Sequence, residues 1–130
     1  MSPHWFSTHV AYTMAKYGMS MCVLGMAEEF RSQGLAVNAL WPRTAIYTAA
    51  VEMLQGAAAS QYSRTPEIMA DAAYAILCKN PNTCTGNFFI DEEVLIEEGV
   101  QDLKRYARFP ENADNLISDF FLPEKYISKL

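Results

Sequence analysis

The spacing of apolar side chains predicts a long first helix. From Val10 to Ala27 the sequence reads VAYTMAKYGMSMCVLGMA, and Lys16 is the only ionised side chain in it. Apolar residues recur at steps of three and four, which places them on one helix face. We therefore expect a helix from about Ser7 to Ser32. The opposite face is also largely apolar, so we expect other parts of a protein to cover this helix on more than one side.

Two short apolar runs predict buried strands. Residues 35–41 (LAVNALW) end at a proline, and residues 87–91 (NFFID) follow Thr85-Gly86. Residues 44–56 between them predict a loop and a short helix. The triplet Thr65-Pro66-Glu67 predicts the start of a helix that runs to about Cys78, because a capping hydroxyl, a proline and an acid all favour the first turn. Residues 92–98 predict one further helical turn.

This order of elements predicts an α/β fold. Strands that are separated by helices pair in parallel, and a parallel sheet covered on both faces needs more than two strands. We therefore interpret the chain as the carboxyl-terminal portion of a doubly wound, Rossmann-type domain. Residues 1–99 would form this partial domain, and residues 100–130 a carboxyl-terminal extension.

Tyr12 and Lys16 are the strongest candidates for chemistry. Their i, i+4 spacing puts both side chains on one helix face. A cation beside a phenol favours the phenolate and lowers the pKa of the tyrosine, which suits proton exchange with a carbonyl or alcohol. The alternative is a tyrosine at a helix edge beside a lysine whose stem lies along apolar surface.

Four segments resemble the short-chain dehydrogenase/reductase family. Tyr12-Thr13-Met14-Ala15-Lys16 matches the family's Y-x-x-x-K signature. Residues 34–42 (GLAVNALWP) resemble the strand that leads to the cofactor-side turn, and residues 66–72 (PEIMADA) and 85–87 (TGN) resemble the late helix and the final strand. The resemblance extends from about Ser7 to Asp91, with the four segments in the family's order and spacing.

The resemblance implies an oxidoreductase that uses NADP or NAD and acts on the carbonyl or secondary alcohol of a lipid-like or steroid-like substrate. Tyr12 would exchange a proton with the substrate oxygen. Lys16 would lower the pKa of Tyr12 and hold the hydroxyls of the nicotinamide ribose. Pro42, Ile46 and Thr48 would contact the nicotinamide amide and the pyrophosphate. The family's glycine after the proline is replaced here by an arginine at position 43.

Two parts of the family's machinery are not found in this sequence. The glycine-rich phosphate loop is missing, and the catalytic serine would fall before Met1. We therefore expect the chain alone to bind no dinucleotide. The resemblance also implies that the complete form is a homo-oligomer. Two alternatives remain: a non-catalytic dimerisation or interaction module derived from such an enzyme, and an unrelated small α/β binding protein.

Several other polar side chains have structural interpretations. Asn38 is expected to be a strand amide that bonds to backbone, and Thr48 to cap the short helix. Contacts of Arg43 and Arg64 with cofactor phosphates are less favoured hypotheses. The acids at positions 91–93 and 97–98 are expected to be solvated.

Composition and charge restrict the partners. The net charge of −5 and the isoelectric point near 4.9 argue against nucleic acid and membranes as partners. The three cysteines lack metal-ligand spacing, so we expect reduced thiols and no metal site. The final Ser128-Lys129-Leu130 matches a peroxisomal address that is read by an import receptor. We therefore expect a peroxisomal location.

Overall fold

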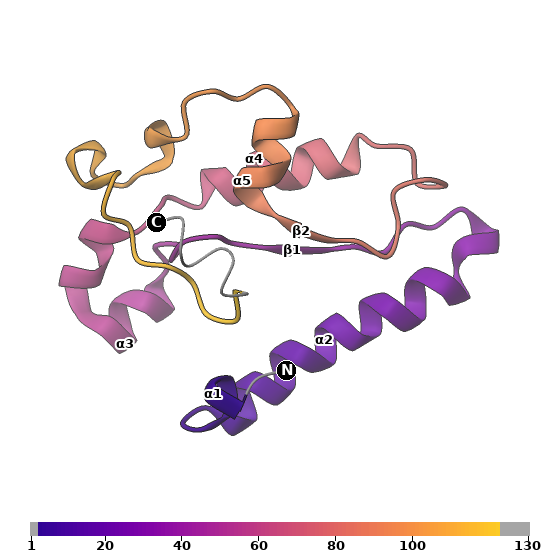
Figure 1. Cartoon of the computed structure of the whole chain (residues 1–130), viewed down its shortest axis with the longest axis horizontal. Helices are drawn as coiled ribbons and strands as arrows, with labels where there is room; N and C mark the ends of the chain where they lie inside the picture. Colours follow the sequence, from indigo (N-terminus) through magenta and orange to yellow (C-terminus); the bar gives the residue numbers. More distant parts are fainter. Residues whose placement is uncertain (1–2, 123–130) are drawn as a thin grey trace. The chain divides into compact units, whose positions relative to one another are not determined.

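The computed structural model describes residues 3–122 and has the expected α/β order (Figure 1). The described residues divide into two compact units, residues 3–39 with 79–89 and residues 40–78 with 90–122. The helices and strands are α1 (Pro3–Phe6), α2 (Val10–Glu29), β1 (Ala39–Trp41), α3 (Ala49–Ala59), α4 (Glu67–Leu77), β2 (Phe88–Ile90) and α5 (Asp91–Glu97). Every predicted helix and strand is therefore present, and the bounds differ by a few residues.

Helix α2 forms most of the first unit. Its buried Thr13 donates a hydrogen bond to the carbonyl oxygen of Trp5 at 2.7 Å, which ties α1 to the first turns of α2. A short 3₁₀ turn follows α2 and ends at Gly34, whose φ of 69° is a left-handed conformation that glycine adopts easily. Helix α2 itself ends at Glu29, with Phe30 as its C-cap, a few residues before the predicted end at Ser32.

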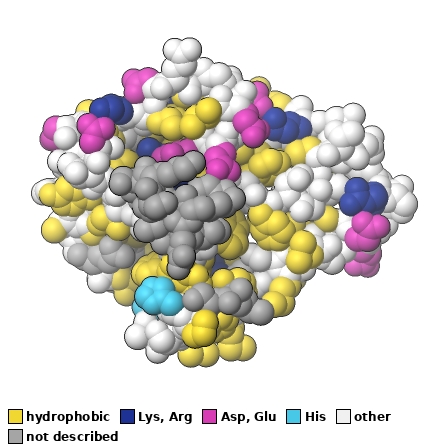
Figure 2. All heavy atoms as spheres, in the orientation of Figure 1, with side chains coloured by type: hydrophobic (Ala, Val, Ile, Leu, Met, Phe, Trp, Pro, Cys, Tyr) yellow, Lys and Arg dark blue, Asp and Glu magenta, His cyan; other side chains and the backbone are white. Residues whose placement is uncertain are grey.

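The described residues of this chain leave most of α2 uncovered, so covering it on more than one side would require further protein. Only Thr13, Val23 and Ala27 of α2 are buried. Few described elements of its own unit pack on it, so its apolar side chains reach the surface, where hydrophobic atoms are widespread (Figure 2). The large exposed apolar side chains of α2 are Val10, Tyr12, Met14, Met19, Met21, Leu24 and Met26.

The two strands lie side by side and run in parallel (Figure 1). The carbonyl oxygen of Val37 accepts a hydrogen bond from the Gly86 N–H at 2.8 Å, and the Ala39 N–H donates to the Asn87 oxygen at 2.9 Å. The side chain of Asn38 completes this pairing. Its Nδ2 donates to the Cys84 oxygen at 2.9 Å, and its Oδ1 accepts from the Asn87 N–H at 3.0 Å. The predicted structural role of Asn38 is confirmed.

Replacing Asn38 by alanine should destabilise the fold. The substitution removes one donor and one acceptor from partly buried backbone groups, which costs about 1–3 kcal/mol in the free energy of unfolding. Urea unfolding would measure the loss. Asn115→Ala is the control, because that side chain is exposed and outside the strand pair. Equal unfolding free energies for the two variants would contradict the assigned role.

Helices α4 and α5 pack together in the second unit and enclose its core. Helix α4 begins where Thr65-Pro66-Glu67 predicted, although its N-cap residue is Pro66 and not Thr65. The Thr65 hydroxyl instead bonds to the Glu67 carboxylate, and this bond is the main reason that the pKa of Glu67 is lowered. The buried apolar side chains of this core include Ile68, Ala72, Ile90, Val94, Leu95, Tyr106 and Leu122.

The segment after Gly99 also belongs to the second unit. Ser118 forms an antiparallel bridge with Thr44, and Ala107 forms one with Arg64. The Tyr106 hydroxyl donates to an Asp71 carboxylate oxygen on α4 at 2.6 Å. These contacts fix residues 100–122 on the unit, whereas the division of the chain at residue 99 stays a prediction. The terminal Ser128-Lys129-Leu130 lies outside the described residues.

Candidate functional site

Tyr12 and Lys16 come together on the exposed face of α2, as their spacing predicted. The Lys16 Nζ lies 5.3 Å from the centre of the Tyr12 ring, within range of a cation–π contact. Tyr12 is 51% exposed, and Lys16 is exposed as well. Both polar ends can therefore be reached by a small molecule. The acid/base role of the pair stays a prediction.

The other predicted cofactor contacts belong to the second unit, in the loop from Pro42 to Thr48. Thr48 is the N-cap of α3, and its Oγ1 accepts a hydrogen bond from the Val51 N–H at 3.3 Å. The capping role predicted for Thr48 is therefore confirmed. Ile46 pairs with Arg64 through a parallel backbone bridge. The cofactor contacts proposed for Pro42, Ile46 and Thr48 stay predictions.

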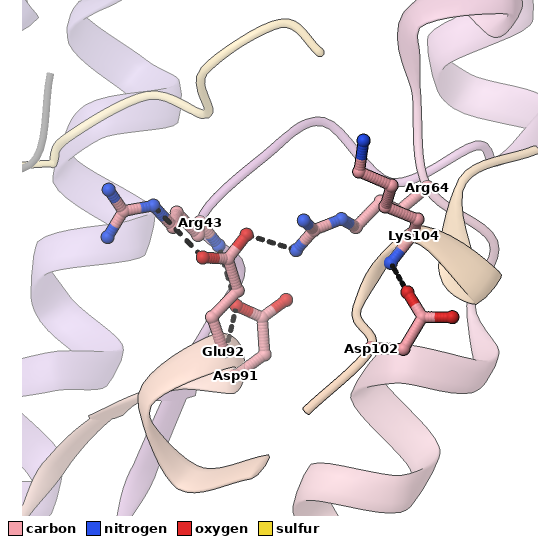
Figure 3. A network of polar contacts seen from close by, with 6 residues as sticks. All are labelled: Arg43, Arg64, Asp91, Glu92, Asp102 and Lys104. Atoms are coloured by element: carbon pink, nitrogen blue, oxygen red, sulfur yellow. Dashed lines mark hydrogen bonds and ion pairs between the residues drawn. The ribbon is translucent and has the colours of Figure 1, made fainter. Parts of the chain in front are cut away.

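A buried charge network lies behind this loop, and Figure 3 shows the Glu92 carboxylate between the guanidinium groups of Arg43 and Arg64. Glu92 Oε2 lies 3.2 Å from Arg43 Nε, and Glu92 Oε1 pairs with Arg64 Nη1. The two arginine side chains are only 11% and 8% exposed. Both cations are therefore engaged within the protein, so the hypothesis that they contact phosphates loses its support.

The prediction that Asp91 and Glu92 are solvated is wrong. Asp91 is fully buried, and the Glu92 side chain is 13% exposed. The predicted burial of the strands is wrong in part, because β1 is only half-buried and β2 begins at the exposed Phe88. Both acids begin α5 directly after Ile90, the buried end of β2, and lie in the interior, where Arg43 and Arg64 compensate their charge. The sequence held one signal of this network, the arginine at position 43 where the resembling family has glycine.

Asp91 has a raised pKa. Its Oδ1 accepts hydrogen bonds from the N–H groups of Arg43 at 2.9 Å and Glu92 at 2.7 Å. Burial raises the pKa of Asp91 from 3.8 to about 6, although these two bonds and the Arg64 charge lower it. Because the folded-state pKa is the higher one, the unfolded chain loses this proton first as the pH rises. Stability is therefore lost between about pH 4 and pH 6.

Asp91→Asn should remove this loss. The asparagine oxygen can keep the two backbone N–H bonds without the cost of a buried charge. Relative to the unsubstituted chain, the variant should gain about 2–3 kcal/mol of unfolding free energy between pH 4 and pH 7.5. Urea unfolding at both pH values measures this difference, and the exposed Glu97→Gln is the control. A pH-independent difference between Asp91→Asn and the unsubstituted chain would contradict the raised pKa.

A second polar contact joins the loop to the segment after α5. The Arg108 guanidinium lies 3.4 Å from the centre of the Tyr47 ring, and the Tyr47 hydroxyl donates to Glu52 on α3 at 2.6 Å. Tyr47 lies between Ile46 and Thr48, so these contacts restrain the loop at the predicted cofactor residues. Sequence reasoning missed them because Arg108 lies far from the loop along the chain.

The described part of the chain contains neither a cluster of metal ligands nor a membrane-spanning helix. Within residues 3–122, no three His, Cys, Asp or Glu side chains are grouped as metal ligands. The cysteines Cys22, Cys78 and Cys84 are free thiols. None of the described helices has the length and apolar character needed to cross a membrane.

Solved structures define the class of fold. A putative dehydrogenase from Xanthomonas campestris is 50% identical and superposes with a TM-score of 0.86, covering 95% of this chain and 44% of its own. A short chain dehydrogenase from Mycobacterium thermoresistibile is 46% identical with a TM-score of 0.81, covering 95% and 43%. No family model matches the sequence. The fold is that of part of a short-chain dehydrogenase, and the resemblance seen in the sequence is confirmed.

The similarity extends to particular proteins. Hydroxysteroid dehydrogenase-like protein 2 from Xenopus tropicalis is 59% identical over 124 residues, which are 95% of this chain and 29% of that protein. The protein of the same name from Rattus norvegicus is 59% identical and 23% covered, and that from Homo sapiens is 55% identical and 29% covered. The chain thus spans less than a third of the length of these relatives.

Proposed function

We propose that this chain carries the acid/base portion of an oxidoreductase that interconverts a carbonyl and a secondary alcohol with NAD or NADP. The observation that carries the proposal is the contact of Tyr12 and Lys16 on an exposed helix face, within a short-chain dehydrogenase fold. The similarity to dehydrogenases supports a nicotinamide cofactor in general, and the choice between NAD and NADP is left to the assay below.

The roles of the residues follow from their chemistry. The Tyr12 hydroxyl donates a proton to the substrate oxygen during reduction and takes it back during oxidation. Lys16 supplies a cation beside that hydroxyl and donates to the ribose hydroxyls. Pro42 and Ile46 contact the nicotinamide amide. A bound nicotinamide supplies or accepts the hydride.

The residues present fit one end of the dinucleotide. The exposed ammonium of Lys16 and hydroxyl of Tyr12 suit ribose hydroxyls. Thr48 stands at the amino end of α3, where backbone N–H groups favour an anionic oxygen of the pyrophosphate. The sequence offers no glycine-rich loop for the remaining phosphate contacts. We therefore expect binding only when the rest of a short-chain dehydrogenase domain is supplied.

A lipid-like or steroid-like substrate is part of the proposal. Met53 and Leu54 on α3 are 79% and 77% exposed. They follow the proposed cofactor loop directly along the chain and offer apolar surface to a hydrocarbon. Gly56 interrupts the helix with a φ of 76°, a conformation that favours glycine.

A dinucleotide titration tests the proposed function. The part of the Xenopus tropicalis relative that precedes its region of similarity would be fused before this chain. The fluorescence of NADH and of NADPH would then be followed during titration with this fusion protein and with the chain alone. We expect micromolar binding by the fusion protein and none by the chain. Absence of binding by a folded fusion protein would contradict the function, and micromolar binding by the chain alone would contradict the need for a supplied phosphate loop.

A non-catalytic interaction module is the second candidate, favoured by the exposed apolar side chains of α2. Met14 and Leu24 are 63% and 60% exposed, which is unusual for a helix with so few charges. The proposed occupant of this face is a second copy of the chain or an intact relative. Analytical ultracentrifugation, alone and with the Xenopus tropicalis protein, would detect either complex. This candidate would be refuted if the chain stays monomeric and does not bind the Xenopus tropicalis protein.

A peroxisomal location completes the proposal. It rests on Ser128-Lys129-Leu130, which the import receptor would read as an address. A fluorescent protein fused before Met1 should report peroxisomal import in cells. Removal of Leu130 should leave it in the cytosol, and import that survives the removal would refute this address.

A further inference from the structure

We propose that Glu92 is a positioning residue for the loop from Arg43 to Thr48, and that it acts by holding Arg43 and Arg64 together. The functional meaning of this loop rests on the proposed function, because the loop carries predicted cofactor contacts. The structural part of the inference rests only on contacts within the second unit.

The two ion pairs of Glu92 are well shielded from water. Its two carboxylate oxygens engage different arginines, with Oε2 3.2 Å from Arg43 Nε and Oε1 paired with Arg64. The three side chains are 13%, 11% and 8% exposed. Salt screens such a pair less than one on the surface, and loss of one partner leaves a charge poorly solvated.

Arg64 transmits this restraint to the loop through its backbone. Its N–H donates to the Ala45 oxygen at 2.9 Å, and its carbonyl oxygen accepts from the Tyr47 N–H at 2.8 Å. Ile46 is therefore held between two hydrogen bonds to one residue. The Arg64 side chain forms an ion pair with Glu92. The Glu92 carboxylate therefore restrains the position of Ile46 indirectly, through the backbone hydrogen bonds of Arg64.

Arg43 restrains the beginning of the same loop. Its N–H donates to Asp91 Oδ1, and its side chain pairs with Glu92. Two adjacent acids at the start of α5 thus hold both the backbone and the side chain of one residue. The network thus pairs both arginine side chains with Glu92.

Amide hydrogen exchange followed by NMR tests the inference on the full chain. In Glu92→Gln we expect the amide protons of Arg64 and Tyr47, which form the two hydrogen bonds around Ile46, to exchange about tenfold faster, since these bonds open locally. The Nε–H resonance of Arg43 should move and lose protection. The control Glu97→Gln lies on the same helix, is exposed, and should change neither signal.

Unchanged exchange at Arg64 and Tyr47 in a folded Glu92→Gln protein would overturn the inference. If that protein does not fold, Arg64→Gln removes the ion pair that restrains the bonds around Ile46, and unchanged Tyr47 exchange in this variant would also overturn the inference. Neither hydrogen-exchange measurement depends on cofactor binding. The positioning role can therefore fail while the dinucleotide titration succeeds, and the reverse outcome is equally distinguishable.

Discussion

Tyr12→Phe should lower the turnover number of the completed domain by about 10²–10⁴-fold, the usual contribution of a positioned acid or base. The substitution removes only the hydroxyl, so the ring and its contact with the Lys16 ammonium remain. Dinucleotide affinity should therefore change little, and the loss should fall on the proton-transfer step. Steady-state oxidation of NADH or NADPH by the fusion protein, with a ketone substrate, measures the effect.

Tyr17→Phe is the matched control for this loss. Tyr17 lies on the same helix, and its ring stacks on Phe6 with centroids 5.7 Å apart. Removing its hydroxyl tests whether any tyrosine of α2 matters for turnover. Equal rates for Tyr12→Phe and the unsubstituted fusion protein would contradict the acid/base role. A similar loss in both variants would point to a structural effect.

Glu92→Ala should cost about 3–5 kcal/mol of unfolding free energy, because removing one member of a buried ion pair leaves an uncompensated charge. Here two arginines lose their shared partner, and the Arg64 side chain is only 8% exposed. Urea unfolding would show the loss as a lower midpoint. Glu97→Ala, on the exposed face of α5, should change the midpoint little.

A double replacement separates the two sources of this effect. Glu92→Met combined with Arg64→Met removes one of the two uncompensated cations and keeps similar volume, so it should recover part of the stability, although Arg43 still lacks its partner. The double variant should therefore be more stable than Glu92→Ala. If both proteins were equally unstable, packing and not unpaired charge would explain the loss.

The helices and strands could be predicted because their signals are local. A three- and four-residue apolar spacing marks α2, and a short apolar run that ends at Pro42 marks β1. The pairing of Tyr12 with Lys16 also follows from helix geometry alone. Predictions that depend on a few neighbouring residues were therefore confirmed.

The charge network could not be predicted because its partners are far apart in the sequence. Asp91 and Glu92 resemble a solvated acidic run until β2 carries them beside Arg43 and Arg64. The bridge between Ser118 and Thr44 depends on tertiary packing in the same way. Local patterns do not encode such contacts, and the acids were therefore misassigned to the surface.

Hydride transfer by the completed domain tests the central claim most directly. The fusion protein would be mixed with NADH or NADPH deuterated at the transferring carbon and with a lipid-like ketone, and the alcohol would be examined by mass spectrometry. We predict an alcohol that carries one deuterium on its carbinol carbon. A folded fusion protein that binds the dinucleotide but never produces labelled alcohol from a panel of ketones would contradict the account.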